Sequence, residues 1–116
     1  MNDNIVKDKS EKFAIRIVNL YKYLSESKKE KILSKQILRS GTSIGANLAE
    51  AECAISKNDF LAKIYIAFKE SSETQYWLKL LKNTDYITNQ EFDSLFADCN
   101  EITKILVKTI KTIKNK

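Results

Sequence analysis

The 116-residue chain contains no proline, no histidine and only two glycines, Gly41 and Gly45. Proline and glycine interrupt helices more than other residues do, so their scarcity favours long helices joined by short turns. The missing histidine removes the commonest general base and the commonest zinc ligand. A metal site made only of carboxylates stays open in principle, but we expect no metal, no cofactor and no catalytic residue.

Cysteine and long apolar runs are also scarce. Cys53 and Cys99 lie far apart with no CxxC partner, which is typical of free thiols in a reducing compartment. No apolar run approaches the roughly 18 to 20 residues that span a bilayer. The first residues, MNDNIVKDKSEK, are polar where a signal peptide would be apolar. The sequence therefore predicts a soluble, cytoplasmic protein with no membrane partner.

What the chain does contain is helical periodicity. Hydrophobic residues make up 43% and charged residues 30%, which suits one globular domain over residues 1–116. Four stretches repeat apolar residues at helical spacing and are separated by short polar segments. We predict an all-α, antiparallel, up-down-up-down four-helix bundle, with helices over roughly 5–25, 30–55, 57–82 and 89–113.

The third of these stretches has the most regular core pattern, and the helix starts carry their own signals. A heptad places these residues inward: Phe60, Ile64, Ala67, Ser71, Thr74, Leu78 and Leu81. In the second stretch the inward set is Leu33, Ile37, Ile44, Leu48, Ala51 and Ile55. Ser56 is predicted as an N-cap with Asp59 as its acidic N3 residue, and Thr88 with Glu91 as a capping box. Asp8 with Glu11 resembles a third box, although a start near Ile5 is also open.

A strip of polar residues runs beside the core face of the second and third helices. Its members are Arg39, Ser43, Asn47, Glu50, Lys63, Glu70, Glu73 and Trp77, and we call them the polar strip. One interpretation is a solvated face with ordinary charge pairs. We favour a subunit or partner interface, because tryptophan and arginine are enriched in interface hot spots. A catalytic use of its glutamates is not expected, since bundle di-iron sites also need histidine.

The two glycines lie one turn apart in the second helix. Each costs roughly 1 kcal/mol relative to alanine, so a close neighbour should compensate. With Ser40, Ala46 and Ala49 they form a surface of small residues. The neighbour could be a helix of the same chain or of another subunit.

Charge is unevenly distributed along the chain. Residues 1–39 carry ten basic and five acidic side chains (+5), residues 40–103 five basic and ten acidic (−5), and residues 104–116 five lysines and no acid (+5). The candidate nucleic-acid contacts form a first lysine group, Lys28, Lys29, Lys31 and Lys35, and a second lysine group, Lys104, Lys108 and Lys111. Both suit an RNA or DNA backbone. The alternative is a set of solvated helix ends that suit the macrodipole.

One segment resembles a known family. The stretch QILRSGTSIGANLAE, residues 36–50, is similar to the hallmark segment of the bacterial four-helix bundle proteins encoded in 23S rRNA intervening sequences, also labelled S23 ribosomal protein. The pattern continues in SKNDF (56–60), in KIYIA (63–67) and from Lys69 to Leu78. It is dense over 36–81 and weaker in the first and fourth helices. The family's usual AEG reads Ala49-Glu50-Ala51 here, which leaves the second helix uninterrupted.

The resemblance carries implications for assembly and partners. Proteins of this family are similar to the accessory variability determinant of diversity-generating retroelements, a homopentamer that binds nucleic acid and associates with a reverse transcriptase. The resemblance therefore implies that this chain forms a homo-oligomer, expected to be a pentamer. It also implies nucleic acid as a ligand and a reverse transcriptase as a partner. The polar strip then becomes the subunit contact. The alternative function is a protein-protein interaction scaffold with no nucleic-acid role.

Overall fold

The computed structural model describes residues 3–115, with side chains from Ile5 onward. It contains four long helices: α1 (Asp3–Lys22), α2 (Leu33–Ala51), α3 (Lys57–Asn83) and α4 (Asn89–Lys114). A π-helical turn, η1 (Tyr23–Ser27), prolongs α1. Residues 3–115 include no β-strand. The predicted all-α class is confirmed.

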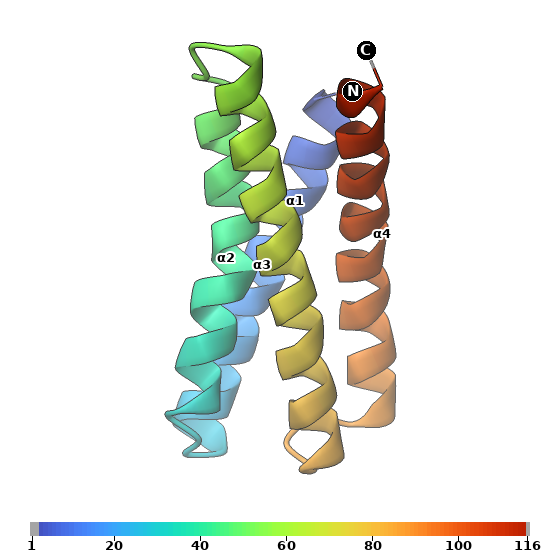
Figure 1. Ribbon diagram of the computed structural model, residues 1–116. Coiled ribbons are helices and arrows are strands. Elements are labelled where there is room, and N and C mark those ends of the chain that lie inside the picture. Colours follow the sequence, from blue (N-terminus) through green and yellow to red (C-terminus); the bar gives the residue numbers. More distant parts are fainter. Residues whose placement is uncertain (1–2, 116) are drawn as a thin grey trace.

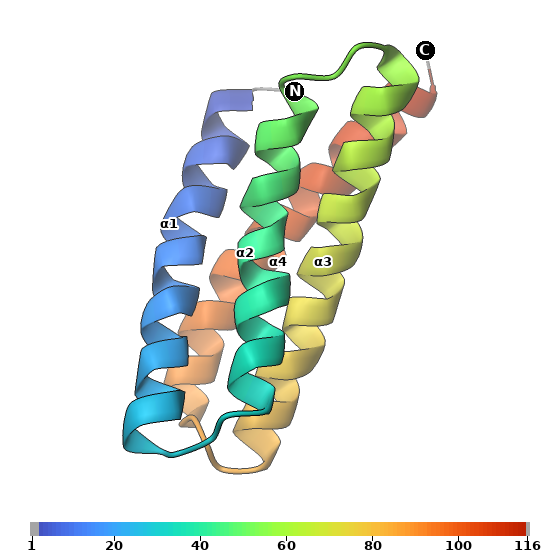
Figure 2. The same cartoon turned by 90° about the vertical axis from the view of Figure 1, so that its left-hand side faces the viewer.

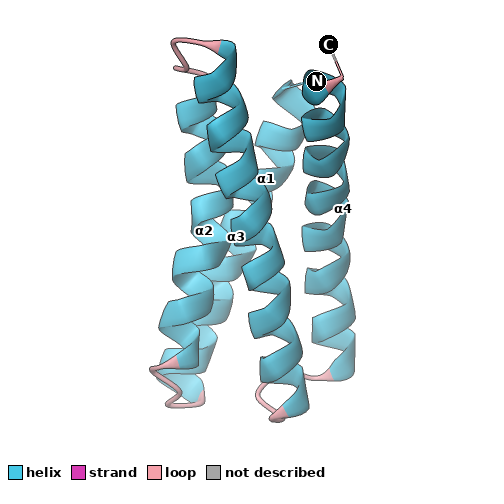
Figure 3. Cartoon of the chain, viewed as in Figure 1, coloured by secondary structure: helices cyan, strands magenta, loops and turns pink. Residues whose placement is uncertain are grey.

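Successive helices run in opposite directions and form an elongated bundle (Figures 1 and 2). Each helix packs against its neighbours in the chain, and α4 closes the bundle against α1. The Cα extents are 47 × 22 × 19 Å. Loops lie only at the two ends of the bundle (Figure 3). The predicted up-down-up-down arrangement is confirmed, and it puts the α1–α2 turn and the C-terminal end of α4 at opposite ends (Figure 1).

The caps predicted for α3 and α4 are both present. The Ser56 hydroxyl accepts a hydrogen bond from the Asp59 N–H at 3.0 Å. The Thr88 hydroxyl accepts from the Glu91 N–H at 3.1 Å, and the Glu91 carboxylate accepts from the Thr88 N–H at 2.8 Å. These bonds satisfy N–H groups that the first turn leaves unpaired. Both helices therefore start at the predicted residues 57 and 89 and end within one residue of prediction.

The predicted range 30–55 for the second helix is wrong at both ends. Lys29 has φ of 59°, a left-handed conformation that ends the preceding helix. The Glu30 carboxylate accepts hydrogen bonds from the Ile32 and Ser34 N–H groups, so Glu30 caps α2 from outside. At the other end Ile55 is 94% exposed instead of buried, and its N–H donates to Asp59. Neither end carries a glycine or proline that would have marked it.

The first helix also differs from its prediction. Asp8 lies within α1, so the capping box proposed for Asp8 and Glu11 is wrong, and the alternative of an earlier start holds. The helix continues through η1 to Ser27, two residues beyond the predicted end at 25. A π turn widens the backbone ring to an i+5 bond, and the Lys28 N–H accordingly donates to the Tyr23 carbonyl at 3.2 Å.

The core follows the predicted heptads with a polar layer inside it. Fully buried apolar side chains come from every helix: Phe13, Ile17, Leu24, Ile37, Ile44, Ile64, Leu78, Ile102 and Leu106. The heptad positions Ser71 and Thr74 are buried as predicted. Thr74 Oγ1 lies 2.9 Å from Ser40 Oγ and 2.8 Å from the Glu70 carbonyl. Ser71 Oγ donates to the Phe68 carbonyl at 2.7 Å, so burial of these hydroxyls is compensated.

The two glycines of α2 face α1 of the same chain. A Cβ atom on Gly41 would lie 2.8 Å from both Cγ1 and Cγ2 of Ile17. A Cβ atom on Gly45 would meet Ser10 Oγ at 3.3 Å. The close neighbour that these glycines required is therefore a helix of the same chain. They no longer argue for a subunit interface.

Candidate functional site

The polar strip is brought together where α2 lies beside α3. Arg39 Nη1 donates to Glu70 Oε2 at 2.8 Å, and the other guanidinium nitrogen pairs with Glu73. The Glu70 side chain is only 16% exposed. One arginine therefore neutralises two carboxylates that would otherwise repel each other. Partial burial is the largest single influence on the pKa of Arg39 and lowers it, but the two glutamates together raise that pKa.

The remaining strip residues also have partners within the chain. Lys63 Nζ pairs with Glu50 Oε1 at 3.0 Å. Asn47 Nδ2 donates to the Ser43 carbonyl at 2.8 Å. Ser43 Oγ donates to the Arg39 carbonyl at 2.6 Å. Two of these contacts lie within α2 and one joins α2 to α3, and the function of the polar strip as a subunit interface stays a prediction.

Trp77 is the largest side chain of the strip. It is half-buried against the core, and its indole Nε1–H donates to Glu73 Oε2 at 3.0 Å. Its ring meets Tyr76 edge-on, with centroids 5.0 Å apart. The indole therefore packs partly against the apolar core, meets the exposed Tyr76 ring, and donates into the ion-pair network. These partners all lie in the same chain, so a second subunit is not needed to explain its position.

Replacing Arg39 should destabilise the fold, because Glu70 and Glu73 then repel each other without a neutralising cation. We expect Arg39→Met to lower the free energy of unfolding by about 1 to 2 kcal/mol, because Glu70 loses its ionic partner while partly buried. Lys12→Met is the matched control, since the Lys12–Asp8 pair (3.0 Å) is exposed on both sides and should contribute less than about 0.5 kcal/mol. Urea unfolding at neutral pH measures both. Equal effects would contradict a structural role for Arg39.

The first lysine group surrounds the turn between α1 and α2. All four of its side chains are exposed. Lys28 Nζ lies 5.8 Å from the centroid of the Tyr23 ring, and Lys29 occupies the left-handed position of the turn. Glu30 lies between Lys29 and Lys31 in the chain, and its carboxylate accepts a hydrogen bond that caps α2.

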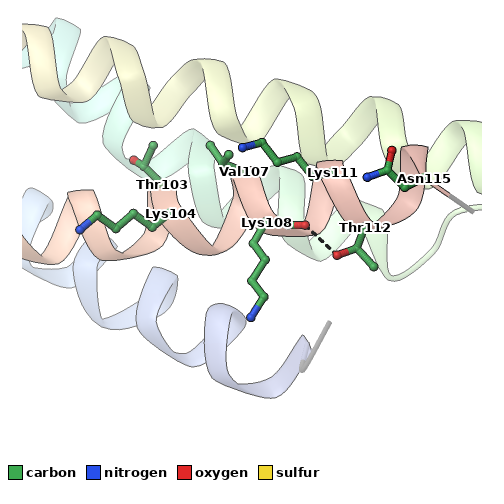
Figure 4. A pocket seen from close by; sticks show the side chains of 7 residues that line it. All are labelled: Thr103, Lys104, Val107, Lys108, Lys111, Thr112 and Asn115. Atoms are coloured by element: carbon green, nitrogen blue, oxygen red, sulfur yellow. Dashed lines mark hydrogen bonds between the residues drawn. The ribbon is translucent and has the colours of Figure 1, made fainter.

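The second lysine group lines a shallow hollow of about 400 Å³ on α4 (Figure 4). Its lining residues are Thr103, Lys104, Val107, Lys108, Lys111, Thr112 and Asn115. Within residues 5–115 none of the three lysines forms a salt bridge. Lysines elsewhere on this end differ, since Lys9 Nζ pairs with Glu101 at 2.6 Å and Lys114 Nζ lies 5.2 Å from the Tyr65 ring centroid.

The structure does not bring the two lysine groups together. The first lies at the α1–α2 turn and the second on the C-terminal half of α4, at opposite ends of the bundle (Figures 1 and 4). The sequence assigned them as two separate groups, and whether an oligomer brings them together stays open; their role as nucleic-acid contacts stays a prediction. The threonines and Asn115 of the hollow were not singled out from the sequence. Helical spacing puts only Asn115 on the face of Lys104, Lys108 and Lys111, while Thr103 and Thr112 lie on opposite sides of that face.

The comparisons with known proteins place this geometry in a family. The family model described as 23S rRNA-intervening sequence protein matches residues 2–108. The chain belongs to this family. A crystal structure of a protein of unknown function from the S23 ribosomal protein family of Bacteroides thetaiotaomicron is 58% identical, with a TM-score of 0.94. The match covers 96% of this chain and 99% of that one. The search of curated proteins gives no match.

Two features of the described residues bear on metal binding and on membrane insertion. Among the described residues, no three histidine, cysteine, aspartate or glutamate side chains gather closely enough to hold a metal ion. No helix in the same part of the chain is long and apolar enough to cross a bilayer. The glutamates of the polar strip are engaged in the ion pairs with Arg39 and Lys63.

Proposed function

We propose that this protein is a non-enzymatic, homo-oligomeric bundle that binds the phosphate backbone of nucleic acid. The observation that carries the proposal is the hollow on α4, where three ammonium groups lie without a carboxylate partner among residues 5–115. Lysines that neutralise phosphates release counterions, and this release supplies most of the affinity of sequence-independent binding. The residues after Glu101 contain five lysines and no acid, so nothing there offsets the positive field.

The helix macrodipole accounts for only part of this lysine cluster. A cation stabilises the negative C-terminal end of a helix, but the effect falls off within the last turn. α4 ends at Lys114. Lys108 lies nearly two turns and Lys104 nearly three turns before that end, at about 3.6 residues per turn. A binding role for these two lysines therefore has more support than helix stabilisation.

Salt dependence tests the proposal. We expect log K for a mixed-sequence duplex or a structured RNA to fall with log salt at a slope of about −2.7 if three phosphates are neutralised, which is about 40-fold between 50 and 200 mM salt. The triple variant Lys104→Gln/Lys108→Gln/Lys111→Gln should lose this dependence. Fluorescence anisotropy measures both.

The opposite end of the bundle supplies the matched control. Lys28→Gln/Lys31→Gln/Lys35→Gln removes the same charge from the first lysine group and should keep most of the affinity. If this variant loses binding and the α4 variant keeps it, the site is assigned to the wrong end. If the unmodified protein retains neither RNA nor DNA at 50 mM salt, the proposal fails and the scaffold alternative is favoured.

The oligomer forms the second part of the proposal. The family resemblance supports a pentamer, with the polar strip as the subunit contact. We expect Trp77→Ala and Asn47→Ala to lower the mass measured by light scattering, while Tyr23→Ala, an exposed aromatic residue at the α1–α2 end, leaves it unchanged. Circular dichroism checks that each variant stays folded. An unchanged mass for both strip variants would exclude the strip as the interface.

The same resemblance extends the proposal to the biological setting. It supports a role as accessory factor to a reverse transcriptase, or a link to an rRNA intervening sequence. The genes beside the coding sequence distinguish the two settings, because a reverse-transcriptase cassette and an rRNA insertion leave different neighbours. If neither gene arrangement is found, the biological setting stays unassigned and only the binding role is supported.

A further inference from the structure

We infer that the hollow on α4 takes double-helical nucleic acid by its backbone alone, in preference to single strands and without reading base sequence. This inference rests on the proposed function and names the ligand class of the same site. It follows from which groups in the hollow are free to donate, which are missing, and how the lysines are spaced.

The hydrogen bonds already formed in the hollow leave mainly charge for a ligand. Thr112 Oγ1 donates to the Lys108 carbonyl at 2.9 Å (Figure 4). Thr103 Oγ1 lies 2.9 Å from the Cys99 carbonyl and 3.0 Å from Ser71 Oγ, so its hydrogen is also used inside the bundle. The donors that remain are the three ammonium groups and the Asn115 amide. Ammonium groups bind phosphates as point charges, whereas a base sequence is read by several donors and acceptors held in fixed geometries, and the described lining of the hollow includes a single side-chain amide, that of Asn115.

The hollow also lacks the groups that bind single strands. Single-strand sites combine positive charge with aromatic side chains on which the bases stack. No aromatic residue and no arginine lines this hollow. Tyr65, which belongs to α3, already has Lys114 Nζ over its ring at 5.2 Å. A single strand would therefore contribute phosphate contacts and little else.

The spacing of the lysines favours the denser backbone. Lys104, Lys108 and Lys111 are attached to one side of α4 over about 10 Å at 1.5 Å per residue, and the Lys108 side chain points toward α1 while that of Lys111 points toward α3 (Figure 4). Duplex DNA presents one negative charge per roughly 1.7 Å of its axis, so about six phosphates fall within that length. All three lysines then find a phosphate whatever the base sequence. A single strand carries fewer charges and releases fewer counterions for each one neutralised.

Anisotropy titrations with the full chain test this inference. The probes are two DNA duplexes of unrelated sequence, an RNA duplex of matching length, and one separated strand of each. We expect the duplexes to bind more tightly than their strands, with slopes of about −2.7 for duplex and about −2.1 for single strand. The two DNA sequences should agree within about two-fold, and DNA and RNA duplexes should bind alike because groove shape and the 2′-hydroxyl are not contacted.

The outcomes separate this inference from the proposed function. Three results would overturn this inference and leave nucleic-acid binding itself standing. They are equal or tighter binding of single strands, a preference of about ten-fold for one duplex sequence, and a preference of about ten-fold for the DNA duplex over the RNA duplex. Tyr65→Leu adds an internal test. It should leave single-strand affinity unchanged, and a loss would show that the bases do stack on Tyr65. Absence of binding by every probe would overturn both the inference and the proposed function.

Discussion

Replacing Gly41 by alanine is expected to lower the free energy of unfolding by about 2 kcal/mol, although alanine is the better helix former. The added Cβ would lie 2.8 Å from two carbon atoms of Ile17, a distance that such atoms do not tolerate. Ile17 is fully buried, so it has no free space into which it can turn. α1 and α2 must then move apart, and the core contacts between them weaken. Urea unfolding followed by circular dichroism gives the value.

Gly45→Ala is the matched control in the same helix. Its Cβ would meet Ser10 Oγ at 3.3 Å, a contact that a small shift of the serine side chain relieves. The gain in helix propensity of about 1 kcal/mol should offset this shift, so we expect stability to be unchanged or slightly higher. A loss similar to that of Gly41→Ala would mean that glycine is needed for another reason at both positions.

A double-mutant cycle locates the clash. Ile17→Ala alone creates a cavity and should cost about 2 to 5 kcal/mol. In the Gly41→Ala background the same change removes both clashing carbons, so its cost should be smaller by about 2 kcal/mol. If the changes in the free energy of unfolding are additive, the Ile17 side chain is not what excludes a side chain at position 41.

Stability should also fall in alkaline solution because of Cys99. Burial, the largest influence, raises the pKa of the Cys99 thiol to about 12. An unfolded cysteine has a pKa of about 8.5, so above that pH the unfolded state loses a proton that the folded state keeps. The folded state then binds more protons, and the free energy of unfolding decreases by about 1.4 kcal/mol per pH unit up to about pH 12. Between pH 8 and 10 this amounts to about 2 kcal/mol.

The comparison with Cys99→Ala isolates this effect. All other ionisable groups, the exposed Cys53 included, are the same in both proteins, so their contributions cancel in the difference. The variant should lose about 2 kcal/mol less than the original chain between pH 8 and 10, measured by urea unfolding at each pH. A thiol reagent at pH 8 should modify one cysteine in the folded protein and two in the unfolded one. Parallel pH profiles, or two reactive thiols in the folded state, would contradict the buried thiol.

The parts of the fold that local sequence encodes were predictable. The caps at Ser56 and Thr88 fix α3 and α4, because a cap involves residues only three apart. The ends of α2 were not predictable, since the chain turns at Lys29, a left-handed residue with none of the usual glycine signal. Ile55 misled for the same reason, because its periodic position continued a helix that the backbone had already left.

The candidate site was predictable in its residues and less so in its arrangement. Helical periodicity placed Arg39 and Glu70 on adjoining strips, and the structure pairs them. The predicted up-down-up-down order also implied that the two lysine groups lie at opposite ends, because such a bundle puts the α1–α2 turn and the C-terminal end of α4 at opposite ends. The sequence could not show that Lys9 pairs with Glu101 while Lys104 has no salt bridge among residues 5–115, since the two helices concerned are separated by most of the chain.

By itself the sequence determined the class of fold, most of the buried faces of α2 and α3, and the starts of α3 and α4. These features depend on contacts within about one turn, where 3.6 residues per turn fixes which side chains share a face. Only the tertiary structure decided that Gly41 packs against Ile17, that the polar strip is partnered within its own chain, and that Lys104, Lys108 and Lys111 line one hollow without a salt bridge among residues 5–115. Those outcomes depend on how each helix is rotated and shifted along its neighbour. Contacts between residues far apart in the chain determine this rotation and shift.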